Sequence, residues 1–222
     1  MARERTAQAA PLSGRRAQAA VNDRRILQAA REVFLADREA PIAAVAERAG
    51  VGMSALYRRY PSKEELLQRI CADGLDRYIA EVETALAREG DAWQSFVAFM
   101  AGTVEANSNS LVSRLAGTFT PTPEMYAAAD RAQRLNVKLF ERTKASGAIR
   151  EDVDVNDLGL IFEQLAAIRL GDERRTAELR RRYLQLFLDA IHRPSDEPLP
   201  GQAPTWQELA ERWSPTASPP QA

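Results

Sequence analysis

Apolar residues recur at intervals of three and four along most of this chain, which is the spacing that places them on one face of a helix. No stretch alternates between apolar and polar residues as a half-buried strand does, so the pattern predicts an all-α protein. The apolar positions from Ile26 to Phe34 predict a first helix that begins at Asn22 or Asp23, since either side chain can cap it. Residues 1–21 lack this periodicity and are expected to form a disordered basic arm.

Two short helices separated by a glycine turn are the most informative part of the pattern. Residues 42–49 present an apolar face and stop at Gly50, because glycine readily takes the left-handed conformation that ends helices. A second short helix, over about residues 53–60, directs Leu56 and Tyr60 inward. A helix, a tight turn and a second short helix form the helix-turn-helix that enters the major groove of DNA. The pattern therefore predicts a DNA-reading unit near the N-terminus.

The rest of the chain predicts a helical body. Pro61 ends the second short helix, and a long helix then runs to about Ala87 and connects the head to the body. Further helices are expected over residues 92–106, 123–146, 154–168 and 173–191, with a short one through Leu111, Leu115 and Ala116. The chain after Pro194 is rich in proline and contains one short amphipathic turn. The expected organisation is an arm, a head, a body and a tail, over residues 1–21, 22–68, 69–193 and 194–222.

Charge is distributed unevenly, although the formal net charge of the chain is −1. Residues 1–63 hold 12 basic and 6 acidic side chains, a net +6, whereas residues 64–222 hold 18 and 25, a net −7. A basic head on an acidic body is expected of a DNA-binding protein with a separate regulatory part. The acidic body argues against a non-specific architectural DNA binder, since such proteins depend on diffuse positive charge.

The chemistry available for other functions is sparse. Cys71 is the only cysteine and His192 the only histidine, which excludes an intramolecular disulfide, a Cys-based metal cage and a multi-His metal site within one chain. No phosphate-binding loop or serine-based catalytic motif occurs, so the sequence predicts neither an enzyme nor a cofactor. No apolar run has the length of a membrane span, and the first 20 residues lack the apolar core of a signal peptide. We therefore expect a soluble cytoplasmic protein.

Three segments of the head resemble the TetR family of transcriptional regulators. The family pattern IL-x-A-A-x-x-x-F appears at residues 26–34, IA-x-x-AGVS at residues 45–52, and LY-x-x-F-x-x-KEEL at residues 56–66. In the body only the architecture and the GAIRED stretch at residues 147–152 are similar. The resemblance implies a three-helix DNA-binding head, joined by a long fourth helix to a helical ligand-binding and dimerisation body, in a bacterial protein that acts on the nucleoid. Gly52 departs from the family pattern, which has a serine cap there.

The resemblance also implies the contacts with double-stranded DNA. The predicted contacts are Gly52, Met53, Ser54, Ala55, Tyr57, Arg58, Arg59 and Lys63. Ser54 can hydrogen-bond a base edge, while Met53 and Ala55 can contact thymine methyl groups. Arg58 can read guanine or lie along the phosphate backbone, and both interpretations remain open.

Three of these residues match positions that hold phosphates in the family, namely Tyr57, Arg59 and Lys63. A phenol and two cations are chemically able to do so. Tyr57 can also be a core aromatic, but Leu56 and Tyr60 already fill the inward positions of the same helix. Arg59 and Lys63 can alternatively be solvated charges.

The apolar residues of the body have two interpretations, ordinary core or the functional surfaces that the resemblance implies. A pocket for an unidentified, mostly apolar effector would be lined by Phe96, Met100, Leu115, Phe119 and Phe162. One head reads only half of a palindromic site, so a homodimer is expected. Its interface would be a four-helix bundle that includes Leu158, Ile161, Leu165, Leu179, Tyr183 and Leu186.

The predicted function is thus that of a homodimeric repressor, which binds a palindromic operator and is released by a small effector. An activator, or a regulator that needs no ligand, would have the same head and remains the alternative.

Overall fold

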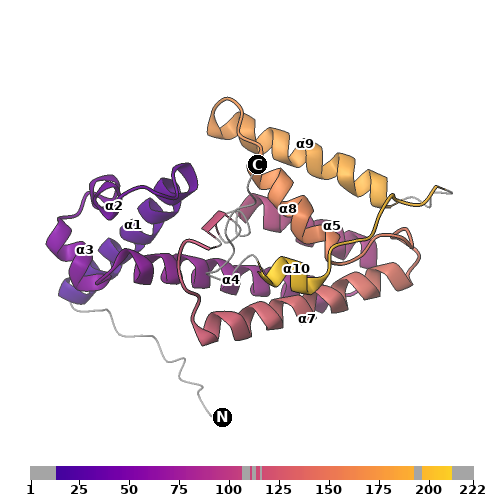
Figure 1. Cartoon of the computed structure of the whole chain (residues 1–222), viewed down its shortest axis with the longest axis horizontal. Helices are drawn as coiled ribbons and strands as arrows, with labels where there is room; N and C mark the ends of the chain where they lie inside the picture. The colour runs from indigo at the N-terminus through magenta and orange to yellow at the C-terminus, as the bar shows by residue number, and fades with distance from the viewer. Residues whose placement is uncertain (1–13, 107–110, 112–113, 116, 193–196, 212–222) are drawn as a thin grey trace, which may run out of the picture. The chain divides into compact units, whose positions relative to one another are not determined.

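The computed structural model of the chain describes residues 14–106, 111, 114, 115, 117–192 and 197–211. These residues form helices and contain no strand, so the all-α prediction is confirmed (Figure 1). The chain divides into two compact units, residues 1–63 and 64–222, which are the basic and the acidic part of the sequence. The division falls at the start of the long helix α4 (Lys63–Ala87), which the sequence predicted as the connector.

The head is a three-helix unit made of α1 (Gly14–Ala36), α2 (Ile42–Ala49) and α3 (Met53–Arg59). Helix α1 packs against α2, and α2 packs against α3. Gly50 ends α2 with a φ of 65°, so the predicted left-handed turn is confirmed. The buried residues of the three helices include Ile26, Ala30, Phe34, Val45, Ala46 and Leu56.

Helix α1 begins at Gly14, so the predicted start at Asn22 or Asp23 is wrong. Both residues lie within the helix and do not cap it. Arg, Ala and Gln are good helix formers, so a helix can extend along a segment that has no apolar periodicity. Residues 14–21 therefore do not belong to a disordered arm, and the remainder of the predicted arm, residues 1–13, lies outside the described residues.

The body contains α4, α5 (Ala92–Ala106), α7 (Pro123–Ala145), α8 (Asp157–Ala167) and α9 (Glu173–Ile191), close to the predicted ranges. Helix α5 packs against α7, α8 and α9, and α8 packs against α9. One cluster of buried apolar residues joins all five helices. The short helix predicted through Leu111, Leu115 and Ala116 falls largely outside the described residues, although Leu111 and Leu115 themselves are buried.

Three aromatic rings occupy the core of the body. Tyr78 of α4, Phe99 of α5 and Phe162 of α8 contact one another edge to face, with ring centroids 5.6, 6.4 and 6.2 Å apart. This geometry is favourable for aromatic rings because the edge of one meets the face of the next. The Tyr78 hydroxyl donates to Asn136 Oδ1 at 3.0 Å, and burial raises the pKa of this phenol. The three rings therefore fix the connecting helix to the centre of the body.

The C-terminal tail is anchored to the body by a carboxylate and a guanidinium. Arg150 donates from Nε and Nη2 to the two oxygens of Asp152, at 2.5 and 2.7 Å. Asp152 also accepts the Leu199 amide at 2.7 Å, and Arg150 Nη2 donates to the Glu197 carbonyl at 2.9 Å. Arg150 first, and then the Leu199 amide, lower the pKa of Asp152 to about 2. The tail then enters the last described helix, α10 (Trp206–Glu211).

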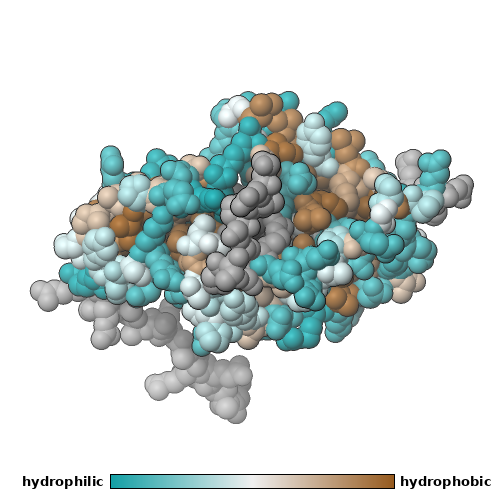
Figure 2. All heavy atoms as spheres, in the orientation of Figure 1, coloured by the Kyte–Doolittle hydropathy of each residue, from teal (hydrophilic) through white to brown (hydrophobic). Residues whose placement is uncertain are grey.

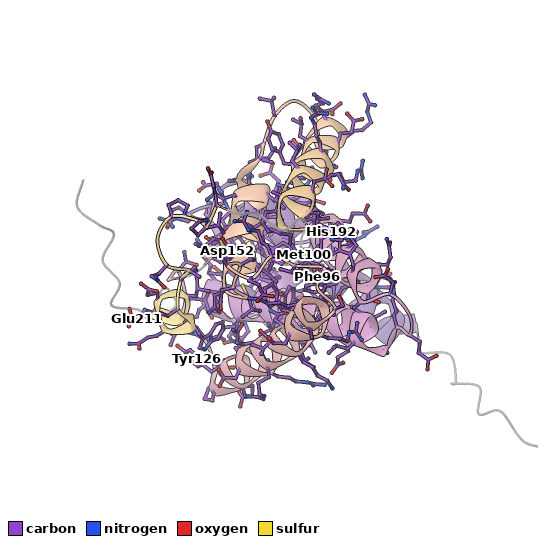
Figure 3. All side chains as sticks on the ribbon, turned by 90° about the vertical axis from the view of Figure 1, so that its right-hand side faces the viewer. Phe96, Met100, Tyr126, Asp152, His192 and Glu211 are labelled. Atoms are coloured by element: carbon purple, nitrogen blue, oxygen red, sulfur yellow. The ribbon has the colours of Figure 1, made fainter. Side chains whose placement is uncertain are left out.

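Helix α10 is closed by its own side chains and docks on the body. Thr205 Oγ1 accepts the Glu208 amide at 3.2 Å while Glu208 Oε2 accepts the Thr205 amide at 2.7 Å, which is a capping box. Leu209 lies against Gly159 of α8, since a Cβ at that glycine would be 3.6 Å from Leu209 Cδ1. Figures 1 and 3 also place α10 beside α7, with Glu211 near Tyr126.

Candidate nucleic-acid interface

Helix α3 turns one side into the head and the other side to solvent. Leu56 and Tyr60 are buried, with 0% and 5% of their surface exposed, whereas Met53 and Tyr57 expose 37% and 45%. Within the described part of the head, these are the two large apolar side chains that are exposed. They are four residues apart and therefore lie on the same face of the helix. The interpretation of Tyr57 as a core aromatic is wrong.

The other predicted base contacts share this accessible surface. Gly52, Ser54 and Arg58 are exposed, and Ala55 is half-buried. Gly52 precedes α3 in an extended conformation and provides no side-chain cap, as expected from the missing serine. The structure thus brings a hydroxyl, a guanidinium, a phenol and a thioether together on one short helix. These are groups that can meet base edges, phosphates and thymine methyl groups in a major groove.

Arg59 is held by an acidic residue that the sequence analysis did not assign to the site. Its Nε donates to Asp23 Oδ1 at 2.6 Å and its Nη2 donates to Oδ2 at 3.2 Å. The hydroxyl of Tyr60 donates to the same Oδ1 at 2.8 Å, and Arg59 lies 5.4 Å from the centre of the Tyr60 ring. Asp23 raises the pKa of Arg59, chiefly by accepting its hydrogen bonds. Arg59 is therefore not the simple solvated charge that the alternative interpretation proposed.

Lys63 is also engaged within the head. Its Nζ donates to the Arg38 carbonyl at 3.3 Å and lies 5.2 Å from the centre of the Phe34 ring. These contacts tie the first residue of α4 to the turn that follows α1. A role of Lys63 at a phosphate stays a prediction.

The five predicted effector contacts all lie inside the body. Phe96, Met100 and Phe162 belong to the central cluster, and Figure 3 shows the first two at the centre of the helices. Leu115 and Phe119 are buried as well, at 0% and 7% exposed. Their role as ligand contacts stays a prediction.

A polar residue inside the body, Thr103, was not singled out from the sequence. Thr103 is 2% exposed, and its Oγ1 has no hydrogen-bond partner among the described residues. A buried hydroxyl without a partner costs free energy and calls for an explanation. Thr143, by contrast, is 0% exposed and donates to the Leu139 carbonyl at 2.8 Å. A lone Thr among apolar residues carries no distinctive sequence signal.

The predicted dimer residues separate into two groups. Leu158, Leu165 and Leu179 are buried within their own chain, which favours the interpretation of these three as ordinary core. Tyr183 and Leu186 expose 50% and 53%, and Ile161 is half-buried. Each stripe therefore contributes in part to the core of its own chain, and the dimer interface stays a prediction. Among the described residues on and next to α8 and α9, the exposed large apolar side chains are Leu160, Leu170, Tyr183 and Leu186. Figure 2 shows hydrophobic surface along α9.

The other described residues provide neither a reactive thiol nor a metal-binding group. Cys71 is fully buried, and burial raises the pKa of its thiol to about 12, so little reactive thiolate forms near neutral pH. No group of three or more His, Cys, Asp or Glu in the described ranges could hold a metal ion. Nor is any helix of the described part long and apolar enough to cross a bilayer.

The head is a basic three-helix unit, in which the short helix α3 follows a glycine turn and faces outward. Together with the helical body that follows, these features define a helix-turn-helix DNA-binding protein. Two family profiles match the chain: bacterial regulatory proteins of the tetR family over residues 26–70, and the C-terminal domain of SbtR-like transcriptional regulators over residues 88–193. The chain belongs to the TetR family of transcriptional regulators. A comparison with curated protein sequences finds no match.

Solved structures of TetR regulators share the fold. A TetR transcription regulatory protein from Mycobacterium vanbaalenii is 26% identical, with a TM-score of 0.51, over 80% of this chain and 99% of that one. SCO0520 from Streptomyces coelicolor is 25% identical, with a TM-score of 0.53, over 77% and 98%. LfrR from Mycobacterium smegmatis, in complex with proflavine, is 20% identical, with a TM-score of 0.59, over 75% and 95%.

Proposed function

We propose that this chain is a homodimeric repressor that binds a palindromic operator and is released by a small, mostly apolar effector. The observation that carries the DNA-binding part is the outward face of α3, where Met53, Ser54, Tyr57 and Arg58 are exposed together. Because Leu56 and Tyr60 are buried on the opposite face, these four side chains point away from the core of the head. The half-site that they read requires a second copy of the head for a complete operator.

The homodimer is supported by the apolar surface of the last two long helices. Leu160, Leu170, Tyr183 and Leu186 expose 38%, 64%, 50% and 53%. Exposed large apolar side chains that gather on one face are typical of an interaction surface. A second copy of α8 and α9 would bury it in a four-helix bundle.

The effector is supported by the interior of the body. Among the described residues the Thr103 hydroxyl has no partner, in a body whose central cluster is apolar, which suits a largely apolar molecule with one hydrogen-bonding group. LfrR, which shares the fold, is in complex with proflavine. Effector binding would release the operator only if the effector prefers the arrangement of the dimer that does not bind DNA.

The test is fluorescence anisotropy of the protein on DNA upstream of its own gene, over a range of salt concentrations, with Tyr57→Phe beside the wild type. Site-selective binding that weakens with salt and with Tyr57→Phe supports the proposal. Small apolar compounds are then screened for release. A regulator that binds selectively and is released by none of them would be the ligand-independent alternative, and a reporter gene behind the operator separates repression from activation.

A further inference from the structure

Helix α3 lacks the features that would fix its rotation by itself. It has seven residues, Gly52 gives it no side-chain cap, and Leu56 is the buried residue within it. Helices this short are marginal without tertiary contacts. With one buried side chain within the helix, the direction of its outward face depends on further contacts at its ends.

Asp23 of α1 supplies such a contact. It accepts two hydrogen bonds from Arg59 and one from Tyr60, which are the last residue of α3 and the residue that caps it. Two-point contact between a guanidinium and a carboxylate fixes orientation as well as distance. The carboxylate is the better protected partner, with 20% of its side chain exposed against 57% for Arg59. We infer that Asp23 is a positioning residue for DNA reading, which sets the rotation of α3 through Arg59 and Tyr60.

The inference changes the role of Arg59, which the family resemblance places at a phosphate. A guanidinium neutralised by a carboxylate attracts phosphate much less than a free one. Such a guanidinium also displaces few of the counterions that are condensed on DNA, because these ions are released only when a cation neutralises a phosphate. Arg59 therefore acts within the head, where it holds α3. Loss of Asp23 is expected to reduce the discrimination between DNA bases.

The double variant Asp23→Asn/Arg59→Gln separates the two roles, since the pair has zero net charge before and after the change. Affinity for an operator duplex and for a scrambled duplex is measured by fluorescence anisotropy at several salt concentrations. If Asp23 positions α3, selectivity for the operator falls about three- to tenfold while the salt dependence is unchanged. If Arg59 contacts a phosphate, the slope of log affinity against log salt falls by about 0.9 per subunit. That result, or unchanged selectivity, overturns the inference.

The single variant Asp23→Asn guards against a purely structural effect. Arg59 then keeps its charge and loses its neutralising partner. Binding to scrambled DNA therefore becomes tighter, and its affinity falls more steeply as the salt concentration rises. A change that only destabilised the head would lower the thermal midpoint and weaken binding to both duplexes, which contradicts the inference. The inference rests on the proposed operator binding, and the wild type tests that part separately. If the wild type does not discriminate between the duplexes, the proposed operator is wrong. Binding to the scrambled duplex then still tests whether Asp23 neutralises Arg59.

Discussion

The head and the body both expose large apolar side chains, but in different polar surroundings. On α3, Met53 and Tyr57 stand beside the hydroxyl of Ser54 and the guanidinium of Arg58. On α8, the exposed residues that follow Leu160 are Gln164 and Ala167, and neither carries a charge. The first mixture suits a polyanion that carries methyl groups in its groove, and the second suits another apolar surface. Exposure alone therefore does not identify a partner, whereas the polar neighbours of the exposed residue do.

The largest expected effect comes from placing charge on the apolar surface of the body. Tyr183→Glu/Leu186→Glu should convert the proposed dimer to a monomer in sedimentation velocity, because each copy would bring two carboxylates into the apolar interface. Operator affinity should then fall about a hundredfold or more, since the two heads no longer bind as one unit. Tyr126→Glu on α7 is the matched control, as Tyr126 is exposed to a similar extent, 47%, on another helix. A dimer that survives the double substitution would place the interface elsewhere.

A smaller effect is expected from removing the guanidinium of Arg58, which lies on α3 with Met53 and Tyr57. If Arg58 reads guanine in two-point contact, Arg58→Ala should reduce discrimination between bases by about 1–3 kcal/mol, measured with operator duplexes altered one base pair at a time. Arg38→Ala removes the same charge from the turn between α1 and α2 and should leave base preference intact. A uniform loss of affinity on all duplexes, with a lower salt slope, would instead place Arg58 on the phosphate backbone.

A change of similar or smaller size, and of opposite sign, is expected inside the body. Thr103→Val keeps the shape and removes the hydroxyl that lacks a partner, so it should stabilise the ligand-free protein by about 1 kcal/mol. Thr143→Val is the control, because its hydroxyl is bonded to the Leu139 carbonyl and its loss should destabilise by about 1 kcal/mol. Chemical denaturation measures both. Equal effects of the two substitutions would mean that the Thr103 hydroxyl is satisfied in solution.

The smallest effect concerns Asp152. Its pKa is lowered from an ordinary 3.8 to about 2 in the folded chain, so its contribution to stability is complete above pH 3.8 and is lost as the pH falls through about 2. Asp152→Asn should abolish this pH dependence and, at neutral pH, speed amide hydrogen exchange in residues 197–211. Asp189→Asn, on the exposed side of α9, should change neither. Unaltered exchange in the tail would show that the contacts of Asp152 do not hold it.

Patterns within one element predicted much of this structure. The apolar spacing placed Leu56 and Tyr60 inside the head and left Tyr57 outside, and Gly50 marked the turn, because each depends on residues within one helix or at its end. The start of α1 was missed for a related reason. Apolar periodicity reports burial, whereas the helix from Gly14 to Asn22 is carried by the intrinsic preference of its residues.

Contacts between distant parts of the chain were not predictable from the same patterns. Asp23 and Arg59 are 36 residues apart, and nothing near either of them indicates the other. Which apolar residues of α8 are buried within the chain was left open by the sequence for the same reason. Leu158 and Leu160 are both leucines, two positions apart, and only the packing of α8 on its neighbours shows that the first is buried and the second is exposed.

The anchored tail bears on where this protein can be divided. The family match ends at residue 193, yet Asp152 and Gly159, both inside the matched region, contact Leu199 and Leu209 beyond it. A truncation at the family limit would strip the Asp152 carboxylate of its amide donor and uncover the side of α8 on which Leu209 rests. Boundaries chosen by likeness to relatives therefore cut through a folded unit here, and a physical boundary lies no earlier than the self-capped helix α10.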